Sequence, residues 1–230
     1  MKSKWLAPIL PYLAVWAGLF IFKNAWVTLL GFHLAILLTF VYLRPTLPLH
    51  VFFKPAKTKH VLSSILICSL SGLGLYFLWD VFCIADDLHE QLASIGLSGS
   101  TWFGFIAYFS LVNPFFEEYF WRGTLGSDSR QVTIGDLVYA GYHIQVVWNK
   151  THLLSMLFMV FVLTLAGWLW RQFYRRDGSL LAPLLGHMAT DLSILMANYL
   201  RNEKRRSTTL MCCGVSSYKK LHLFYSHGHL

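Results

Sequence analysis

Long apolar stretches without Asp, Glu, Lys or Arg occupy most of the first half of the chain. They cover residues 5–22, 24–43 and 61–79, and a fourth lies at residues 151–170. A helix needs roughly 20 apolar residues to cross a hydrocarbon core about 30 Å thick, and each stretch is close to that length. The pattern therefore predicts four membrane-spanning helices.

Three further apolar stretches, all in the second half, have ionisable residues within them or directly beside them. They cover residues 102–116, 137–148 and 178–200. Together with the uninterrupted stretch at residues 151–170, they give the second half four helices. We therefore predict an all-α fold, a polytopic transmembrane helical bundle with seven or eight spans.

The change of pattern near residue 100 predicts three parts of the chain. Residues 1–100 form N-terminal transmembrane helices, and residues 101–200 form a helical core that holds the intramembrane ionisable residues. Residues 201–230 open with a basic cluster and then lose all apolar periodicity. This last part is expected to be a disordered tail beside the membrane.

Composition supports a membrane protein. Hydrophobic residues make up 56% and charged residues 13% of the 230 residues, whereas about 25% of an ordinary soluble domain is charged. The first apolar stretch follows two lysines, as in a signal peptide. Pro8, Pro11 and bulky residues near its end leave no small-residue cleavage site, which favours an uncleaved helix.

The net charge of +8 does not indicate a nucleic-acid partner, because the basic residues gather between and after the apolar stretches. This distribution is typical of topology signals, in which Lys and Arg mark cytoplasmic loops. Residues 44–60 are basic and expected inside, while residues 80–90 hold four acidic residues and are expected outside. Seven spans would place the basic cluster at residues 201–206 outside, against the rule. Either one stretch does not cross the lipid bilayer, or the tail is an exception.

Ionisable residues inside apolar helices need a partner, a polar cavity or a function. A charge near the bilayer centre costs on the order of 2.5–3.5 kcal/mol on insertion scales. Glu118 and Arg122 are four residues apart and share one helical face, so they can form a neutralising ion pair. Glu117 is rotated by about 100° from Glu118 and is left as an unpaired carboxylate. His187 and Asp191 also share a face.

His143 lies on a helix of its own, four residues after Tyr139. An unpaired carboxylate beside imidazoles in a water-filled pocket is suited to general base catalysis, and imidazole NH groups can stabilise a tetrahedral oxyanion. Such groups fit amide hydrolysis without a Ser, Thr or Cys nucleophile.

Each of these residues also has a structural interpretation. Glu118 and Arg122 can simply lock two helices together. His143 and His187 can be hydrogen-bonded core histidines, with Asp191 orienting His187. Five further histidines are predicted to lie in loops or at helix ends and receive no role: His33, His50, His60, His89 and His152.

Three short motifs follow one another in the second half. They are Glu-Glu-x-x-x-Arg at residues 117–122, aromatic-x-x-x-His at 139–143 and His-x-x-x-Asp at 187–191. Their order and type resemble the CPBP family, the membrane-embedded type II CAAX prenyl endopeptidases and their bacterial relatives, with motifs EExxxR, FxxxH and HxxxN or HxxxD. The resemblance covers about residues 101–200. Tyr139 stands where Phe is commoner, and Asp191 stands where many members have Asn, which removes an NH donor.

The resemblance implies a role for each motif residue. Glu117 would activate water as a base, and His143 would help to hold that water. His187 and Asp191 would line the oxyanion side. The supporting residues would be Glu118 and Arg122.

The cofactor stays open in this interpretation. Family names often say metalloprotease, and a zinc ion would be held by Glu117, His143 and His187. A glutamate-activated water without metal fits the family equally well, and the chain lacks the helical zinc signature HExxH.

The sequence therefore predicts a multi-pass intramembrane endopeptidase, expected in the plasma membrane of a prokaryote, whose partner is a membrane-associated protein or peptide substrate. A CAAX-processing role rests on the resemblance alone. The alternative is a non-catalytic immunity or partner-binding membrane protein of the same family. A proton-coupled transporter fits less well, because the first half shows no matching repeat of charged or broken helices.

Overall fold

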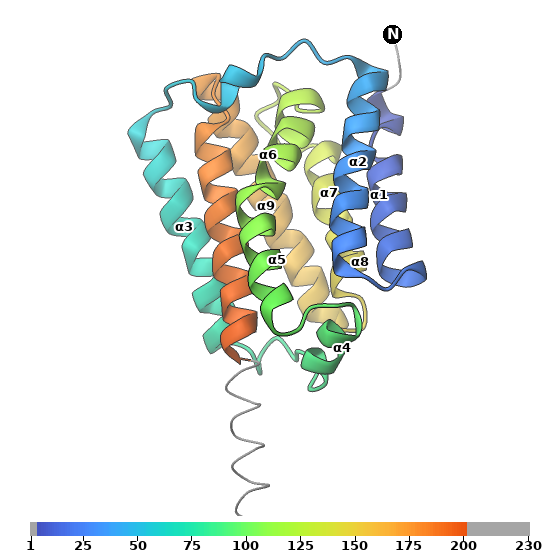
Figure 1. Ribbon diagram of the computed structural model, residues 1–230. Helices are drawn as coiled ribbons and strands as arrows, with labels where there is room; N and C mark the ends of the chain where they lie inside the picture. The colour runs from blue at the N-terminus through green and yellow to red at the C-terminus, as the bar shows by residue number, and fades with distance from the viewer. Residues whose placement is uncertain (1–3, 202–230) are drawn as a thin grey trace, which may run out of the picture.

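The computed structural model describes residues 4–201, and within this part of the chain the fold is all-helical without a β-strand (Figure 1). The α-helices are α1 (Ile9–Trp16), α2 (Ala25–Leu43), α3 (Thr58–Phe77), α4 (Leu88–Ser94), α5 (Ser100–Leu111), α6 (Asn113–Glu117), α7 (Ile134–Gly141), α8 (His143–Val147) and α9 (Leu153–Asp177). Residues 181–201 form a further helix. Helix α1 continues into a π-helical turn, Ala17–Ile21, and α6 continues into another, Glu118–Thr124.

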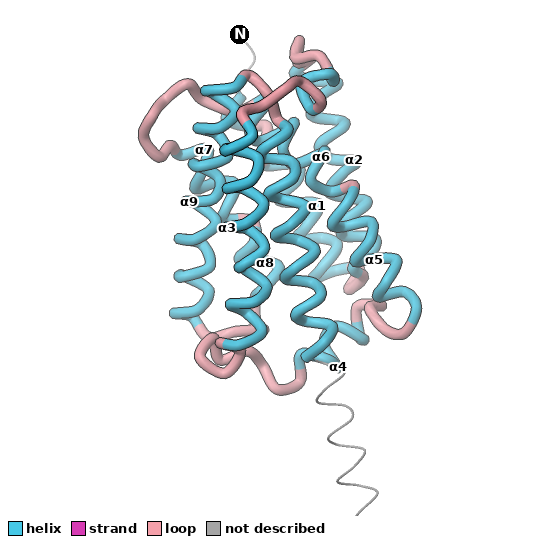
Figure 2. Tube along the Cα trace, turned by 90° about the vertical axis from the view of Figure 1, so that its left-hand side faces the viewer, coloured by secondary structure: helices cyan, strands magenta, loops and turns pink. Residues whose placement is uncertain are grey.

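The long helices lie roughly parallel or antiparallel to one another, and the connections gather at the two ends of the bundle (Figures 1 and 2). The α2–α3 connection lies at the end where the chain begins, and α4 lies at the opposite end (Figure 1). There, the loops before α4 and before α9 are joined by the amide of Ala85, which donates to the carbonyl of Lys150 over 2.9 Å. The predicted basic and acidic loops are therefore on opposite ends of the bundle.

Among residues 4–201, three helices are long and apolar enough to cross a membrane: Ala25–Leu43, Thr58–Phe77 and Leu153–Asp177. They confirm that three of the four uninterrupted apolar stretches form helices of membrane-spanning length. The first stretch yields a shorter helical run, Ile9–Ile21. This run starts only after Pro8 and stops before Lys23, which has a left-handed φ of 48°, and Asn24 then caps α2 through the amide of Val27. Seven or eight spans stay a prediction.

Apolar side chains cover the outside of the bundle. Leu34, Leu38 and Val41 on α2 are 52–73% exposed, and α3 and α9 carry similar rows. Surfaces of this kind are costly in water, and they are normal on helices that face lipid chains. The structure thus describes an integral membrane protein.

One prediction about α2 is wrong. His33 was expected in a loop or at a helix end, but it lies in the middle of α2 and is buried. A single polar residue inside an apolar run is a poor sign of a helix end when a partner from another helix is available. The predicted tail beyond residue 201, with its cysteines and histidines, lies outside the described residues.

Small residues let α3 approach the helix formed by residues 181–201. A Cβ atom added to Gly72 would lie 2.2 Å from the carbonyl oxygen of Ser193, and the Gly72 amide donates to the Ser193 hydroxyl over 3.2 Å. Gly74, two residues further along α3, has no heavy atom within 4 Å of the same position. Helix contact in membranes depends on such close approach, because burial of apolar surface gives little gain in lipid.

We therefore expect Gly72→Ala to destabilise the bundle by about 1–3 kcal/mol, whereas Gly74→Ala leaves it unchanged or slightly more stable. Thermal unfolding of the two purified variants in the same detergent measures this difference. Equal Tm values would show that α3 does not pack against residues 181–201 at Gly72.

Candidate active site

The two adjacent glutamates lie where one helix type changes into another. Helix α5 ends at Leu111, and Pro114 occupies the first turn of the short helix α6, where its missing amide proton costs no hydrogen bond. Helix α6 ends at Glu117, and the π-helical turn begins at Glu118. Wide turns of this kind occur often at functional sites. Here the turn is almost entirely buried.

Glu118 is the centre of a buried ion-pair network. Its side chain is fully buried, and its Oε1 atom lies 3.2 Å from Nη1 of Arg122, which confirms the predicted pair. The same oxygen lies 2.7 Å from Nδ1 of His187. The Arg122 guanidinium stacks over the rings of Tyr139 at 3.8 Å and Trp170 at 4.9 Å, which adds cation–π attraction.

His187 connects this network to the last helix of the bundle. Its ring stacks on Trp170 with centroids 4.9 Å apart. Its Nε2 atom lies 3.6 Å from Oδ2 of Asp191, so the predicted shared face is present at a distance too long for a hydrogen bond. The sequence did not predict that Glu118 would be the closer carboxylate, because the two residues are 69 positions apart.

Glu117 is also buried, but its surroundings are different. Its Oε1 atom accepts hydrogen bonds from Nδ2 of Asn113 and from the Tyr142 hydroxyl, both at 2.7 Å. Its Oε2 atom has no hydrogen-bond partner among the described residues. Glu118 Oε2 also lacks one, yet the charge of Glu118 already faces Arg122 and His187. Among the described residues no basic group forms an ion pair with Glu117.

His143 lies beside Glu117's partner Tyr142. The His143 and Tyr142 rings stack with centroids 4.0 Å apart, and Nδ1 of His143 lies 3.3 Å from the carbonyl oxygen of Tyr139. With its proton on Nδ1, His143 donates to this carbonyl and leaves Nε2 as an acceptor. Tyr142 therefore contacts both the carboxylate and the imidazole that the sequence placed at one site.

Asn113 and Tyr142 are the site residues that the sequence analysis missed. Asn113 lies four residues before Glu117, so the spacing rule that found Glu118 and Arg122 also applies to it. Tyr142 gives no such signal, because its contact depends on the approach of α7 and α8 to α6.

A second buried ion pair fixes the loop that joins the first two motifs. Arg171 on α9 bonds both carboxylate oxygens of Asp136 at 2.7 and 2.9 Å. Its remaining NH groups donate to the carbonyls of Ser127, Ser129 and Gln131. This bidentate geometry is the strong form of an ion pair, and it holds α7 at a set position against α9.

Glu117, His143 and His187, the residues that would hold a zinc ion if one were used, do not form a metal site in this structure. In the described part of the chain no three His, Cys, Asp or Glu side chains lie together in a group that could hold one. Glu118 faces Nδ1 of His187, while two donors face Oε1 of Glu117. We therefore derive no chemical step through a metal.

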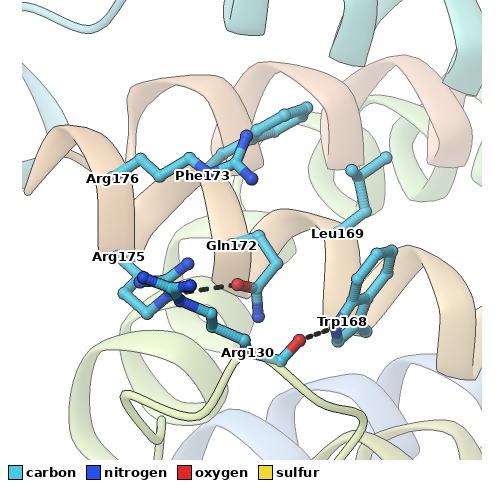
Figure 3. A pocket seen from close by; sticks show the side chains of 7 residues that line it. All are labelled: Arg130, Trp168, Leu169, Gln172, Phe173, Arg175 and Arg176. Carbon is cyan, nitrogen blue, oxygen red and sulfur yellow. Dashed lines mark hydrogen bonds between the residues drawn. The ribbon is translucent and has the colours of Figure 1, made fainter.

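A separate pocket lies at the C-terminal end of α9 (Figure 3). It is lined by Arg130, Trp168, Leu169, Gln172, Phe173, Arg175 and Arg176. The Trp168 indole donates to the carbonyl of Arg130 over 2.8 Å, and Arg175 Nε donates to Gln172 over 3.0 Å. None of the predicted site residues lines this pocket.

Comparison with known proteins supports the family that the motifs indicated. Residues 99–193 match the model of a family described as type II CAAX prenyl endopeptidase Rce1-like. This segment is similar to that family. It contains all six predicted site residues, and the family is one of membrane proteases. No curated protein and no solved structure matches the chain.

The two adjacent carboxylates differ in what they stabilise. Glu118→Gln removes the charge that balances buried Arg122, and breaking a buried pair costs about 3–5 kcal/mol. Glu117→Gln keeps an oxygen that accepts from Asn113 and Tyr142, so its effect on stability is smaller. Tm values of both variants, measured in one detergent, test this order. A larger drop in Tm for Glu117→Gln would show that Glu117, and not Glu118, is the carboxylate that stabilises the bundle more.

Proposed function

We propose that the protein is an intramembrane endopeptidase that hydrolyses a peptide bond in a membrane-associated protein or peptide. The observation that carries this proposal is the arrangement around Glu117. One carboxylate oxygen is held by two donors while the other, Oε2, has no partner in the described residues. A base that is fixed by one oxygen and free at the other is suited to take a proton from water.

The proposed reaction uses water as the nucleophile. Oε2 of Glu117 takes one proton from a water molecule, and the water oxygen bonds to the carbonyl carbon of the scissile peptide. The carbonyl π electrons move onto its oxygen, which becomes an oxyanion. As the C–N bond breaks, the electron pair on the oxyanion re-forms the C=O bond of the new carboxyl group. The proton on Glu117 passes to the leaving nitrogen.

The two histidines have different proposed parts in this reaction. His143 offers Nε2 as an acceptor that orients the attacking water, since its Nδ1 faces the carbonyl of Tyr139. His187 donates to Glu118 through Nδ1. With a proton on Nε2 as well, it is a donor for the oxyanion. Asp191, 3.6 Å from that nitrogen, orients the ring and takes the place of the commoner Asn.

The proposed location is the plasma membrane of a prokaryote, with seven spans. The runs are residues 9–21, 25–43, 58–77, 100–124, 134–147, 153–177 and 181–201. The basic connection after α2 lies at the end where the chain begins, and α4 with the acidic connection lies at the other (Figure 1). Positive loops face the cytoplasm, so we place the start of the chain inside.

A non-catalytic role is the second candidate, and the Glu118 network favours it. Arg122, Glu118 and His187 join two segments by buried charge pairs, and such a network can hold a bundle together without any reaction. An immunity or partner-binding protein of the same family would keep these contacts.

Glu117→Gln separates the two candidates. We expect it to lower peptide cleavage by a factor of about 100 to 10,000, the usual contribution of a general base, with little change in Tm. The substrate is found by proteomics of cells with and without the protein, as a membrane-proximal cleavage that disappears. Purified protein is then assayed on that peptide.

Glu90→Gln is the matched control, because Glu90 is exposed on α4. It should cleave at the wild-type rate. Equal rates for Glu117→Gln and the wild type would reject the endopeptidase. Loss of folding in Glu117→Gln would instead favour the structural role.

A further inference from the structure

His33 is a buried polar residue that the proposed reaction does not use. It lies in the middle of α2 and is 4% exposed. Its ring stacks on Phe116, with centroids 4.1 Å apart and planes 9° from parallel. Because α2 precedes residue 99, His33 lies outside the segment that matches the protease family.

Both ring nitrogens of His33 have partners on the segment that leads to the glutamates. Nε2 lies 3.0 Å from Oδ1 of Asn113, and Nδ1 lies 3.3 Å from the Tyr108 hydroxyl. Asn113 in turn donates through Nδ2 to Oε1 of Glu117 over 2.7 Å. His33 is thus two hydrogen bonds from the proposed base.

The direction of each bond follows from the carboxylate. An ionised carboxylate only accepts, so the NH₂ group of Asn113 must face Glu117, and its carbonyl oxygen must face His33. That oxygen needs a donor, so Nε2 of His33 carries the proton. Nδ1 then has a lone pair and accepts from the Tyr108 hydroxyl. The chain of bonds therefore requires one tautomer of His33.

We propose that His33 is a positioning residue for the hydrolysis proposed above, acting through Asn113 on Glu117. His33 donates a hydrogen bond to the amide oxygen of Asn113 in a buried site, where a carbonyl oxygen without a donor destabilises the fold. The amide is then held with its NH₂ group on Oε1 of Glu117, and Oε2 is kept free. The inference rests on the proposed function for its kinetic part, while the hydrogen-bond chain itself does not need the reaction.

Two substitutions at His33 separate hydrogen bonding from packing. His33→Phe keeps a ring that stacks on Phe116 but removes both nitrogens. His33→Gln loses the ring but carries an NH₂ group that reaches about as far as Nε2. We expect kcat of His33→Phe to fall about tenfold to a hundredfold with KM close to the wild-type value. His33→Gln should recover most of this loss.

His152→Phe is the matched control, because His152 is exposed at the start of α9 and far along the chain from the network. It should have the wild-type kcat. Wild-type kcat in His33→Phe, or an equal loss in His33→Phe and His33→Gln, would overturn the positioning role.

A double-mutant cycle tests whether His33 acts through Asn113. If it does, His33→Phe lowers kcat little further in an Asn113→Ala background. A full additional loss would mean that His33 acts by another route, such as general stability of the bundle.

A measurement on the resting protein decides the contact without a substrate. In protein labelled with ¹⁵N-histidine, the His33 signals are identified by their loss in His33→Gln. We expect a neutral ring with its proton on Nε2, and a shift of these signals in Asn113→Ala. A proton on Nδ1, or signals unchanged by Asn113→Ala, would overturn the inference. If the wild type cleaves nothing, the proposed function fails, while this spectrum still decides the contact.

Discussion

The buried ion pair between Glu118 and Arg122 is the constraint on which the rest of the site depends. Two charges removed from water are favourable only with close geometry and further partners. Here the partners are His187 on the carboxylate and the rings of Tyr139 and Trp170 on the guanidinium. Those side chains come from the last helix of the bundle, α7 and α9. The buried pair is stable only if these helices all pack against the π-helical turn that carries Glu118 and Arg122.

The arrangement gives two adjacent carboxylates different environments. Glu118 is surrounded by positive and potentially positive groups, whereas Glu117 has only neutral donors within hydrogen-bonding distance. A neutral amide and a phenol fix the position of a carboxylate without cancelling its charge. The matching segment is similar to a family of proteases, and this difference supports Glu117 as the base in the proposed reaction.

Contacts within one helix were predictable from the sequence, and contacts between helices were mostly not. Four-residue spacing predicted Glu118 with Arg122, and it applies to Asn113 with Glu117 as well, although that pair was overlooked. The bond from His187 to Glu118 spans 69 positions and depends on how two helices meet. The prediction that His33 lies in a loop or at a helix end was wrong, because the sequence does not show that Asn113 and Tyr108 approach it from other helices. The length of α1 was overestimated, since hydropathy counts apolar residues but does not register where Pro8 and Lys23 limit the helix.

The π-helical turn from Glu118 to Thr124 determines which changes in chain length the site can accept. Each residue in that turn sets the direction of the next, so inserting or deleting one residue would turn Arg122 away from Glu118. The interval between the first two motifs crosses a loop, and loop length has little energetic cost, whereas the interval between the last two contains the membrane-length helix α9. Related chains should therefore keep the spacing inside each motif, while the first interval varies more in length than the second. A search for distant relatives gains most from a fixed spacing inside each motif, a first interval of variable length and a second interval long enough for a spanning helix.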